Sequence, residues 1–172
     1  MGGMRDLTYA EVGATRQVPL PAGYHHLHYR TMIGTGAKVF DCAADAVLTF
    51  RMHRAAGLTV HADDDRATPG VRLTVGRGRF GVPCEVVYTI EEPSRAGFGY
   101  GTLPGHLERG EEAFVVERDS QDRVWFRTVT FSRPVRWSAI VAGPLSQILQ
   151  RGYARLLGRT LKRLCASRTV GS

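Results

Sequence analysis

The most constraining feature of this sequence is an amphipathic pattern near its C-terminal end. From Pro144 to Cys165, apolar side chains return every three or four residues, and most basic side chains fall on the opposite face. A helix over this range would be about 33 Å long at about 1.5 Å per residue, which is enough to cross a whole sheet. The apolar stripe begins before Pro144 and consists of Trp137, Ile140, Val141, Leu145, Ile148, Leu149, Tyr153, Leu156, Leu157, Leu161 and Leu164.

The middle of the chain predicts the sheet that receives this helix. Runs of alternating or β-branched residues are separated by short segments rich in Gly, Pro and Asp. Because links this short join neighbouring strands in opposite directions, the runs predict an antiparallel meander. The expected strands span residues 25–33, 58–61, 71–75, 82–92, 97–103, 111–118 and 124–131.

The order of these elements predicts an α+β fold. Between the first strand and the meander, apolar residues from Val39 to Met52 recur at helical spacing, and the pattern stops at Gly57. This indicates one helix or two short ones. A sheet that covers a long amphipathic helix must curve, and a pocket readily forms beneath its concave face. We therefore expect a helix-grip-like curved antiparallel sheet wrapped around the long C-terminal helix.

Composition and length favour one soluble domain. The chain has 172 residues, of which 43% are hydrophobic and 23% charged, close to the average for globular proteins. We expect an extended arm over residues 1–23, a single domain over 24–166 and a disordered tail over 167–172. No stretch has 18 uninterrupted apolar residues and the N-terminus lacks the apolar core of a secretion signal, so we expect a cytoplasmic protein without a transmembrane segment.

The charge and the cysteines exclude further classes of protein. The net charge is +7, but the arginines are spread along the chain instead of being gathered in one segment, so nucleic acid is not an expected partner. Cys42, Cys84 and Cys165 are widely spaced and contain no Cys-x-x-Cys pair. This spacing predicts reduced, buried thiols, with neither a disulfide framework nor a zinc site.

The sequence contains no complete motif for a metal or a cofactor. His26 and His28 share one face of the first predicted strand, but a third ligand at a recognisable spacing is lacking. Gly76, Gly78 and Gly81 satisfy Gly-x-Gly-x-x-Gly, yet a strand is predicted after them where a dinucleotide site requires a helix. We therefore interpret these glycines as turn residues and expect neither metal nor cofactor.

Several short motifs resemble one protein family. They are residues 7–15 and 21–24, Trp125 with the later Ser132-Arg133-Pro134, and above all Gly-Tyr-Gly-Thr-Leu-Pro-Gly-His at 99–106 followed by Gly-Glu-Glu-Ala-Phe at 110–114. They are similar to the family of bacterial and plant proteins called DUF-nineteen-ninety (DUF1990), from about Leu7 to Cys165. That family has no established activity, so the resemblance implies a domain and a candidate site but no reaction. Its members usually have proline after the histidine, where this chain has Leu107.

The predicted topology also resembles that of the START and Bet v 1 superfamily. Its members enclose lipids, polyketides, hormones and other apolar molecules. This resemblance concerns the order of the elements alone, and a fold by itself does not assign a function.

The turn between the two best-matching motifs concentrates groups that could move protons. Tyr100, His106, Glu111 and Glu112 flank a Pro-Gly turn between two predicted strands. Glu111 and Glu112 point to opposite faces of a strand, so at most one of them reaches an interior cavity. Burial would raise the pKa of that glutamate and make it useful as a general acid or base beside His106. In the alternative, His106 caps the hairpin and both glutamates pair with surface arginines.

Three basic residues are candidates for holding the polar end of a ligand. Arg51 and His53 end the first helical region, and Arg133 lies between the last strand and the long helix. A guanidinium offers a planar fork of donors to a carboxylate or phosphate, so these residues could bind an anionic head group. The alternative is a solvated helix end, favoured by the helix macrodipole.

Three more candidates for ligand binding lie on predicted strands. Tyr88 and Trp125 could form part of a pocket wall, although most buried aromatic residues serve packing alone. Trp125 and Arg127 share one strand face. If that face is concave, Arg127 needs a ligand or a carboxylate as its partner.

These observations leave three functions open. The first is a binding protein that holds a small apolar or amphipathic molecule in an internal pocket. The second is an enzyme on the same scaffold, a cyclase, dehydratase or hydrolase in which His106 acts with Glu111 or Glu112 as acid and base. In the third, the basic face of the C-terminal helix contacts an acidic partner or a membrane surface. The sequence does not fix the ligand or the oligomeric state.

Overall fold

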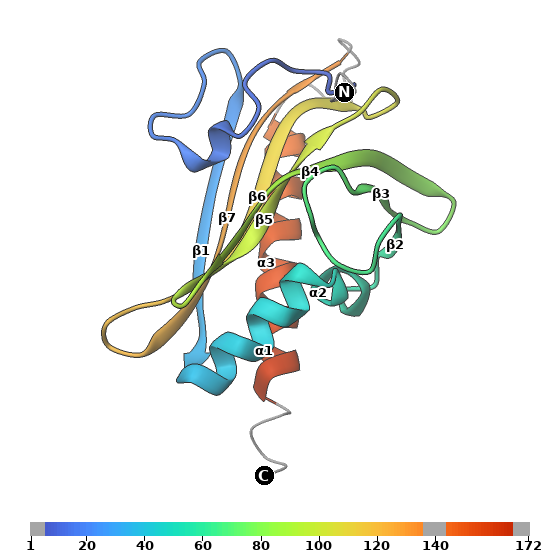
Figure 1. Cartoon of the computed structure of the whole chain (residues 1–172). Helices are drawn as coiled ribbons and strands as arrows, with labels where there is room; N and C mark the ends of the chain where they lie inside the picture. The colour runs from blue at the N-terminus through green and yellow to red at the C-terminus, as the bar shows by residue number, and fades with distance from the viewer. Residues whose placement is uncertain (1–5, 136–143, 167–172) are drawn as a thin grey trace.

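A seven-stranded antiparallel sheet forms the frame of the part of the chain that the computed structural model describes, residues 6–135 and 144–166 (Figure 1). The strand order is β1-β7-β6-β5-β4-β3-β2, so the meander from β2 to β7 is continuous and β1 joins its free edge at β7. The strands are β1 (His25–Thr35), β2 (Thr59–Ala62), β3 (Arg72–Arg77), β4 (Phe80–Glu92), β5 (Arg95–Thr102), β6 (Glu108–Arg118) and β7 (Arg123–Pro134).

The helices occupy the concave side of this sheet. They are α1 (Ala37–Leu48), α2 (Arg51–Ala55) and α3 (Pro144–Ala166), and a short 3-10 helix, η1 (Ala14–Arg16), lies in the N-terminal arm. The first helical region is therefore two short helices, separated at Phe50, whose φ of +57° is left-handed. The prediction of an α+β, helix-grip-like fold is confirmed.

Large side chains fill the space beneath the central strands. Phe98 and Phe114 project from β5 and β6, and the ring of Phe50, from the junction of α1 and α2, lies 5.4 Å from that of Phe98 in an edge-to-face arrangement. All three are fully buried. We expected the long helix to cover this hollow without filling it. Instead α1 and α2 also pack there, and their side chains form one buried cluster with those of the strands and of α3.

The buried face of α3 is narrower than its apolar stripe. Ala154, Leu157 and Leu161 are completely buried, whereas Ile148 and Leu149 are 63% and 64% exposed. Figure 1 shows α3 running beside β1, and it also packs against α1 and α2. The prediction that Ile148, Leu149 and Leu156 join the buried stripe is wrong for these three residues, which are exposed. Trp137, Ile140 and Val141 lie outside the described residues.

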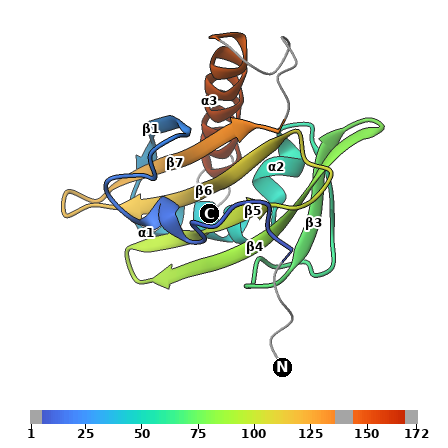
Figure 2. The same ribbon diagram turned by 90° about the horizontal axis from the view of Figure 1, so that it is seen from above.

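The N-terminal arm packs on the convex face of the sheet. Tyr9, Ala14 and Leu20 form a small apolar cluster with Val129 and Phe131 of β7. Figure 2 shows the arm crossing the middle strands. The sheet is therefore covered on both faces, by helices on one side and by the arm on the other.

His53 lies inside the core and away from any charged partner. The residue is 1% exposed, and its ring lies 4.8 Å from that of Phe114, edge to face. Neither ring nitrogen has a hydrogen-bond partner among the described residues. Burial lowers the pKa of His53 to about 3, so the imidazole is neutral at physiological pH.

Replacing His53 with leucine should raise the free energy of unfolding, and the gain should be larger at pH 5 than at pH 8. The folded protein keeps the imidazole neutral down to about pH 3, whereas the unfolded chain protonates it below about pH 6.5. Wild-type stability therefore falls through this window by about 2 kcal/mol between pH 6.5 and pH 5, and the leucine variant lacks this loss. Denaturant unfolding at both pH values measures the difference, and an equal gain at both would contradict the assignment.

Candidate functional site

Strand β6 sends its two consecutive glutamates to opposite faces of the sheet. Glu112 pairs with Tyr100 of β5 and with Thr130 of β7 on the concave face. Glu111 pairs with Phe131, whose ring packs with the arm on the convex face. The strand period of two predicted this separation, and the structure assigns Glu112 to the interior.

The carboxylate of Glu112 lies among hydroxyl groups in a largely desolvated place. It accepts hydrogen bonds from the Tyr100 hydroxyl at 3.2 Å, the Thr130 hydroxyl at 3.3 Å and the Thr128 hydroxyl at 3.4 Å. Burial raises the pKa of Glu112 to about 7, and these long hydrogen bonds offset the effect only in part. At neutral pH the group can therefore either give or take a proton.

A cavity of about 50 Å³ adjoins this carboxylate. Glu112 is half-buried and is one of the residues that line this cavity. The volume is about one sixth of the lower limit of about 300 Å³ for typical ligand pockets, so it accommodates only a few atoms. The residues that line it are Tyr100, Thr102, His106, Glu108, Gly110, Glu111, Glu112, Thr130 and Ser132.

His106 lines the same cavity as a neutral imidazole. Its Nδ1 accepts the backbone N–H of Glu108 at 2.9 Å, so the neutral ring carries its proton on Nε2 and can donate it in a hydrogen bond. Burial lowers the pKa of His106 to about 4. At neutral pH it is therefore a donor to a ligand and not the protonated acid of an acid–base pair.

Helix α3 closes one side of the site. The Gln150 side-chain amide donates to the Glu108 carboxylate at 3.0 Å and to the Ser132 hydroxyl at 3.1 Å. The Tyr153 hydroxyl is buried near Tyr100 and Glu112, and it contributes to raising the pKa of Tyr100. It makes no well-formed hydrogen bond with a described residue. Burial, with the nearby Glu112 charge, raises the pKa of both phenols well above its usual value.

Glu111 fastens the N-terminal arm to the sheet. Its carboxylate accepts the Tyr9 hydroxyl at 2.7 Å, the Gly13 N–H at 2.6 Å, and both the N–H and the hydroxyl of Thr15. Four donors converge on a carboxylate that is 2% exposed, an arrangement matched to its charged form. Although Glu111 is also one of the residues that line the cavity, its carboxylate therefore holds the arm on the convex face.

Two glycines of β5 make room for this arrangement. A Cβ atom on Gly101 would lie 2.2 Å from the Tyr9 hydroxyl oxygen, and one on Gly99 would lie 2.5 Å from the Tyr88 ring. Both rings therefore lie directly over the strand. The two glycines of the Gly-Tyr-Gly sequence at 99–101 thus leave space for aromatic rings on the convex face. Tyr100, between them, points to the cavity on the concave face.

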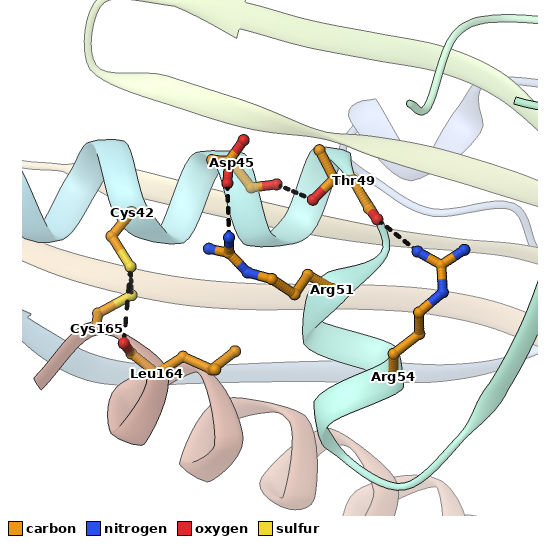
Figure 3. A network of polar contacts seen from close by, with 7 residues as sticks. All are labelled: Cys42, Asp45, Thr49, Arg51, Arg54, Leu164 and Cys165. Carbon is orange, nitrogen blue, oxygen red and sulfur yellow. Dashed lines mark hydrogen bonds and ion pairs between the residues drawn. The ribbon is translucent and has the colours of Figure 1, made fainter. Parts of the chain in front are cut away.

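The basic candidates are placed away from the cavity. Arg51 forms an ion pair with Asp45 at 3.1 Å at the surface of α1, as Figure 3 shows. His53 is buried in the core, because the left-handed turn at Phe50 redirects α2 inward. The exposed Arg133 lies over the Tyr24 ring at 4.9 Å. None of these three groups lines the cavity around Glu112.

The remaining candidates lie on the convex face. The Tyr88 hydroxyl is 2.7 Å from that of Thr15 in the arm. Arg30 stacks over the Trp125 ring at 3.8 Å, and Arg127 lies 4.0 Å from a carboxylate oxygen of Glu117. The face with Trp125 and Arg127 is therefore not the concave one, and the nearest carboxylate to the Arg127 guanidinium is that of Glu117.

Several groups around the cavity were not predicted from the sequence, among them Thr130, Ser132, Gln150 and Tyr153. Thr130 and Ser132 alternate on one face of β7, so pairing β7 with β6 could have placed them beside Glu112. Gln150 and Tyr153 belong to α3, and no local pattern places that helix against β6 and β7. Among residues 6–135 and 144–166, no three His, Cys, Asp or Glu side chains gather as metal ligands would, and no helix combines the length and hydropathy needed to cross a bilayer.

The chain has a helix-grip-like fold, which solved structures of other proteins share. A hypothetical protein from Helicobacter pylori superposes with a TM-score of 0.61 at 17% identity, over 97% of this chain and 98% of its own. A norcoclaurine synthase of Thalictrum flavum, a point mutant solved with a transition-state analogue, gives a TM-score of 0.60 at 9% identity, over 85% of this chain and 96% of its own. At these identities the likeness concerns the fold alone.

The family follows from sequence comparison. Residues 8–160 match the family described as a domain of unknown function, DUF1990, and the chain belongs to that family. A UPF0548 protein of Deinococcus radiodurans is 35% identical over 170 residues, covering 91% of this chain and 86% of that protein. A UPF0548 protein of Arabidopsis thaliana is 36% identical over 80 residues, covering 43% of this chain and 39% of its own. The predicted family is confirmed.

Exchanging each glutamate for glutamine should separate their roles. Glu111→Gln places an amide nitrogen among four donors, so the free energy of unfolding should fall by about 3 kcal/mol. Glu112→Gln removes a charge that burial disfavours in the folded protein, so the free energy of unfolding should rise at pH 8 instead of falling, by up to about 3 kcal/mol. Denaturant unfolding of the two variants measures both effects under identical conditions. Equal losses in both variants would contradict the assignment of Glu111 to the arm and Glu112 to the cavity.

Proposed function

We propose that this protein binds a small polar molecule in the cavity beside Glu112 and catalyses a proton transfer on it. One observation carries the proposal: a carboxyl group with a pKa raised to about 7 lines a small, partly open cavity next to a phenol. Acid–base catalysis is most effective when the pKa of the catalytic group lies near the working pH. A perturbed carboxyl in a cavity is a recognised mark of such sites.

The groups around Glu112 suggest which residue acts as the base and which binds the ligand. The hydroxyls of Tyr100, Thr128 and Thr130 donate to the Glu112 carboxylate and orient it, so the ionised form acts as the base. His106 offers its Nε2–H as a neutral donor to an oxygen or nitrogen of the ligand. A cyclisation, dehydration or hydrolysis could each use this set.

The charges of the lining favour a neutral or cationic ligand. Glu108 and Glu112 line the cavity, and no lysine or arginine among residues 6–135 and 144–166 does. His106, with a pKa of about 4, adds no positive charge at neutral pH. An anionic group placed there would have no positively charged partner among these residues. Arg51, His53 and Arg133 point elsewhere, so they do not supply one.

The fold is compatible with both binding and catalysis. The norcoclaurine synthase of Thalictrum flavum is an enzyme with the same fold and was solved with a small molecule bound. A large apolar ligand receives less support from this chain, because Phe50, Phe98 and Phe114 fill the space beneath the sheet. The cavity is suited to the reacting group of a substrate and holds little more.

Nuclear magnetic resonance of the side-chain carboxyl carbons should show Glu112 titrating near pH 7. Burial raises its pKa from the ordinary value of 4.5, so its signal should still be changing when exposed glutamates are fully ionised. Glu112→Gln identifies the signal by removing it. A pKa below about 5 would contradict the proposal.

Any turnover found in a substrate screen should depend on the same group. The rate should rise with pH through about 7, since the carboxylate is the active form, and Glu112→Gln should abolish it at every pH. His106→Ala should raise KM more than it lowers kcat, because that residue donates to the ligand. Turnover that persists in the Glu112 variant would rule out this group as the catalyst.

Binding of three small probes of similar size should follow their charge. Methylammonium and methanol should shift the amide resonances of residues around Glu112, whereas formate should not. Glu112→Gln should weaken the binding of methylammonium more than that of methanol, because only the cation is attracted by the negative charge of the carboxylate. Stronger binding of formate than of methylammonium would contradict the charge preference.

A further inference from the structure

Two cysteines that lie far apart in the sequence meet between α1 and α3. The Sγ atoms of Cys42 and Cys165 are 2.8 Å apart, although 123 residues separate them along the chain. Figure 3 shows the two side chains pointing toward each other from facing helices. The carbonyl oxygen of Leu164 lies 3.9 Å from the Cys42 sulfur, which places this sulfur against the last turn of α3. Nothing in the sequence spacing indicated this pair.

The separation is close to that of a covalent bond. A disulfide has a sulfur–sulfur distance of about 2.05 Å, so the two sulfurs need to approach by less than about 1 Å. Both side chains are packed, since Cys42 is 8% exposed and Cys165 is 2% exposed. Their orientation toward one another is therefore set by the packing of the two helices. Cys42 retains more contact with solvent and is the thiol that an oxidant reaches first.

We propose that Cys42 and Cys165 form a reversible disulfide that fastens the end of α3 to α1. A small disulfide such as oxidised glutathione is the oxidant. The Cys42 thiol gives its proton to water, and its thiolate attacks one glutathione sulfur to release one reduced glutathione. The Cys165 thiolate then attacks the mixed disulfide and releases the second. Two protein thiols are oxidised, one glutathione disulfide is reduced, and each departing thiolate regains a proton.

The bond would act on the helix that closes the cavity. Gln150 of α3 holds Glu108 and Ser132 at the cavity wall, and Tyr153 of the same helix lies near Glu112. Cys165 is the second-last residue of α3 and is its anchor point on α1. Oxidation would thus restrict motion of the whole helix relative to the sheet. The proposal does not depend on the function assigned to the cavity.

Oxidised glutathione added to the purified protein should produce this bond without altering the third cysteine. Intact mass should fall by two hydrogen masses, and peptide mapping without reductant should join the peptides of Cys42 and Cys165. The cross-link closes a loop of more than one hundred residues, so the melting temperature should rise by about 10 °C. Dithiothreitol should reverse both changes.

Single alanine variants provide the controls. Cys84→Ala should behave as wild type, because Cys84 is completely buried on β4 and its sulfur lies 4.0 Å from the Val82 carbonyl oxygen. Cys42→Ala and Cys165→Ala should show no rise in melting temperature with oxidant. If wild type acquires only glutathione adducts, or if its melting temperature does not change on oxidation, the proposal is wrong. Either result leaves the assignment of Glu112 unaffected.

Discussion

The alternation of side chains along β6 is the constraint on which the rest of the site depends. Two consecutive carboxylates point to opposite faces of one sheet, and each face provides a different environment. On the convex face, four donors from the arm surround Glu111. On the concave face, burial with a few long hydrogen bonds leaves Glu112 with a pKa raised to about 7. Two neighbouring positions of one strand therefore hold a carboxylate that fastens the arm and a carboxyl group whose pKa is raised to about 7.

The neighbouring strand explains why one short motif serves both faces. Gly99 and Gly101 leave space on the convex face for Tyr88 and Tyr9, and Tyr100 between them reaches Glu112 on the concave face. The arm that carries Tyr9 binds Glu111 through the same hydroxyl that lies over Gly101. Packing of the arm and the position of β5 and β6 therefore support each other. The motifs from which we predicted the family lie at this junction.

The periodicity of the sequence predicted the strands, the helices and the faces on which their side chains lie. It could not predict which elements pack against one another in the folded chain. The strand period separated Glu111 from Glu112, but the choice between them depends on which face the arm covers. His53 was predicted either to hold the polar end of a ligand or to lie at a solvated helix end, yet the left-handed residue Phe50 turns α2 so that the imidazole enters the core. Tyr153 and the pair of Cys42 and Cys165 depend on where α3 docks, which no nearby residues encode.

The pairing of β6 also limits how the gene can change in length. The hairpin turns at 78–79 and 119–122 lie at the surface, where added residues leave the strand register intact. One codon inserted or deleted just before Glu111 would rotate every following side chain to the other face of the sheet. Glu112 would then face the arm, and Glu111 would face the cavity. Members of this family should therefore differ in the lengths of these hairpin turns, while the number of residues from Tyr100 to Phe114 stays constant.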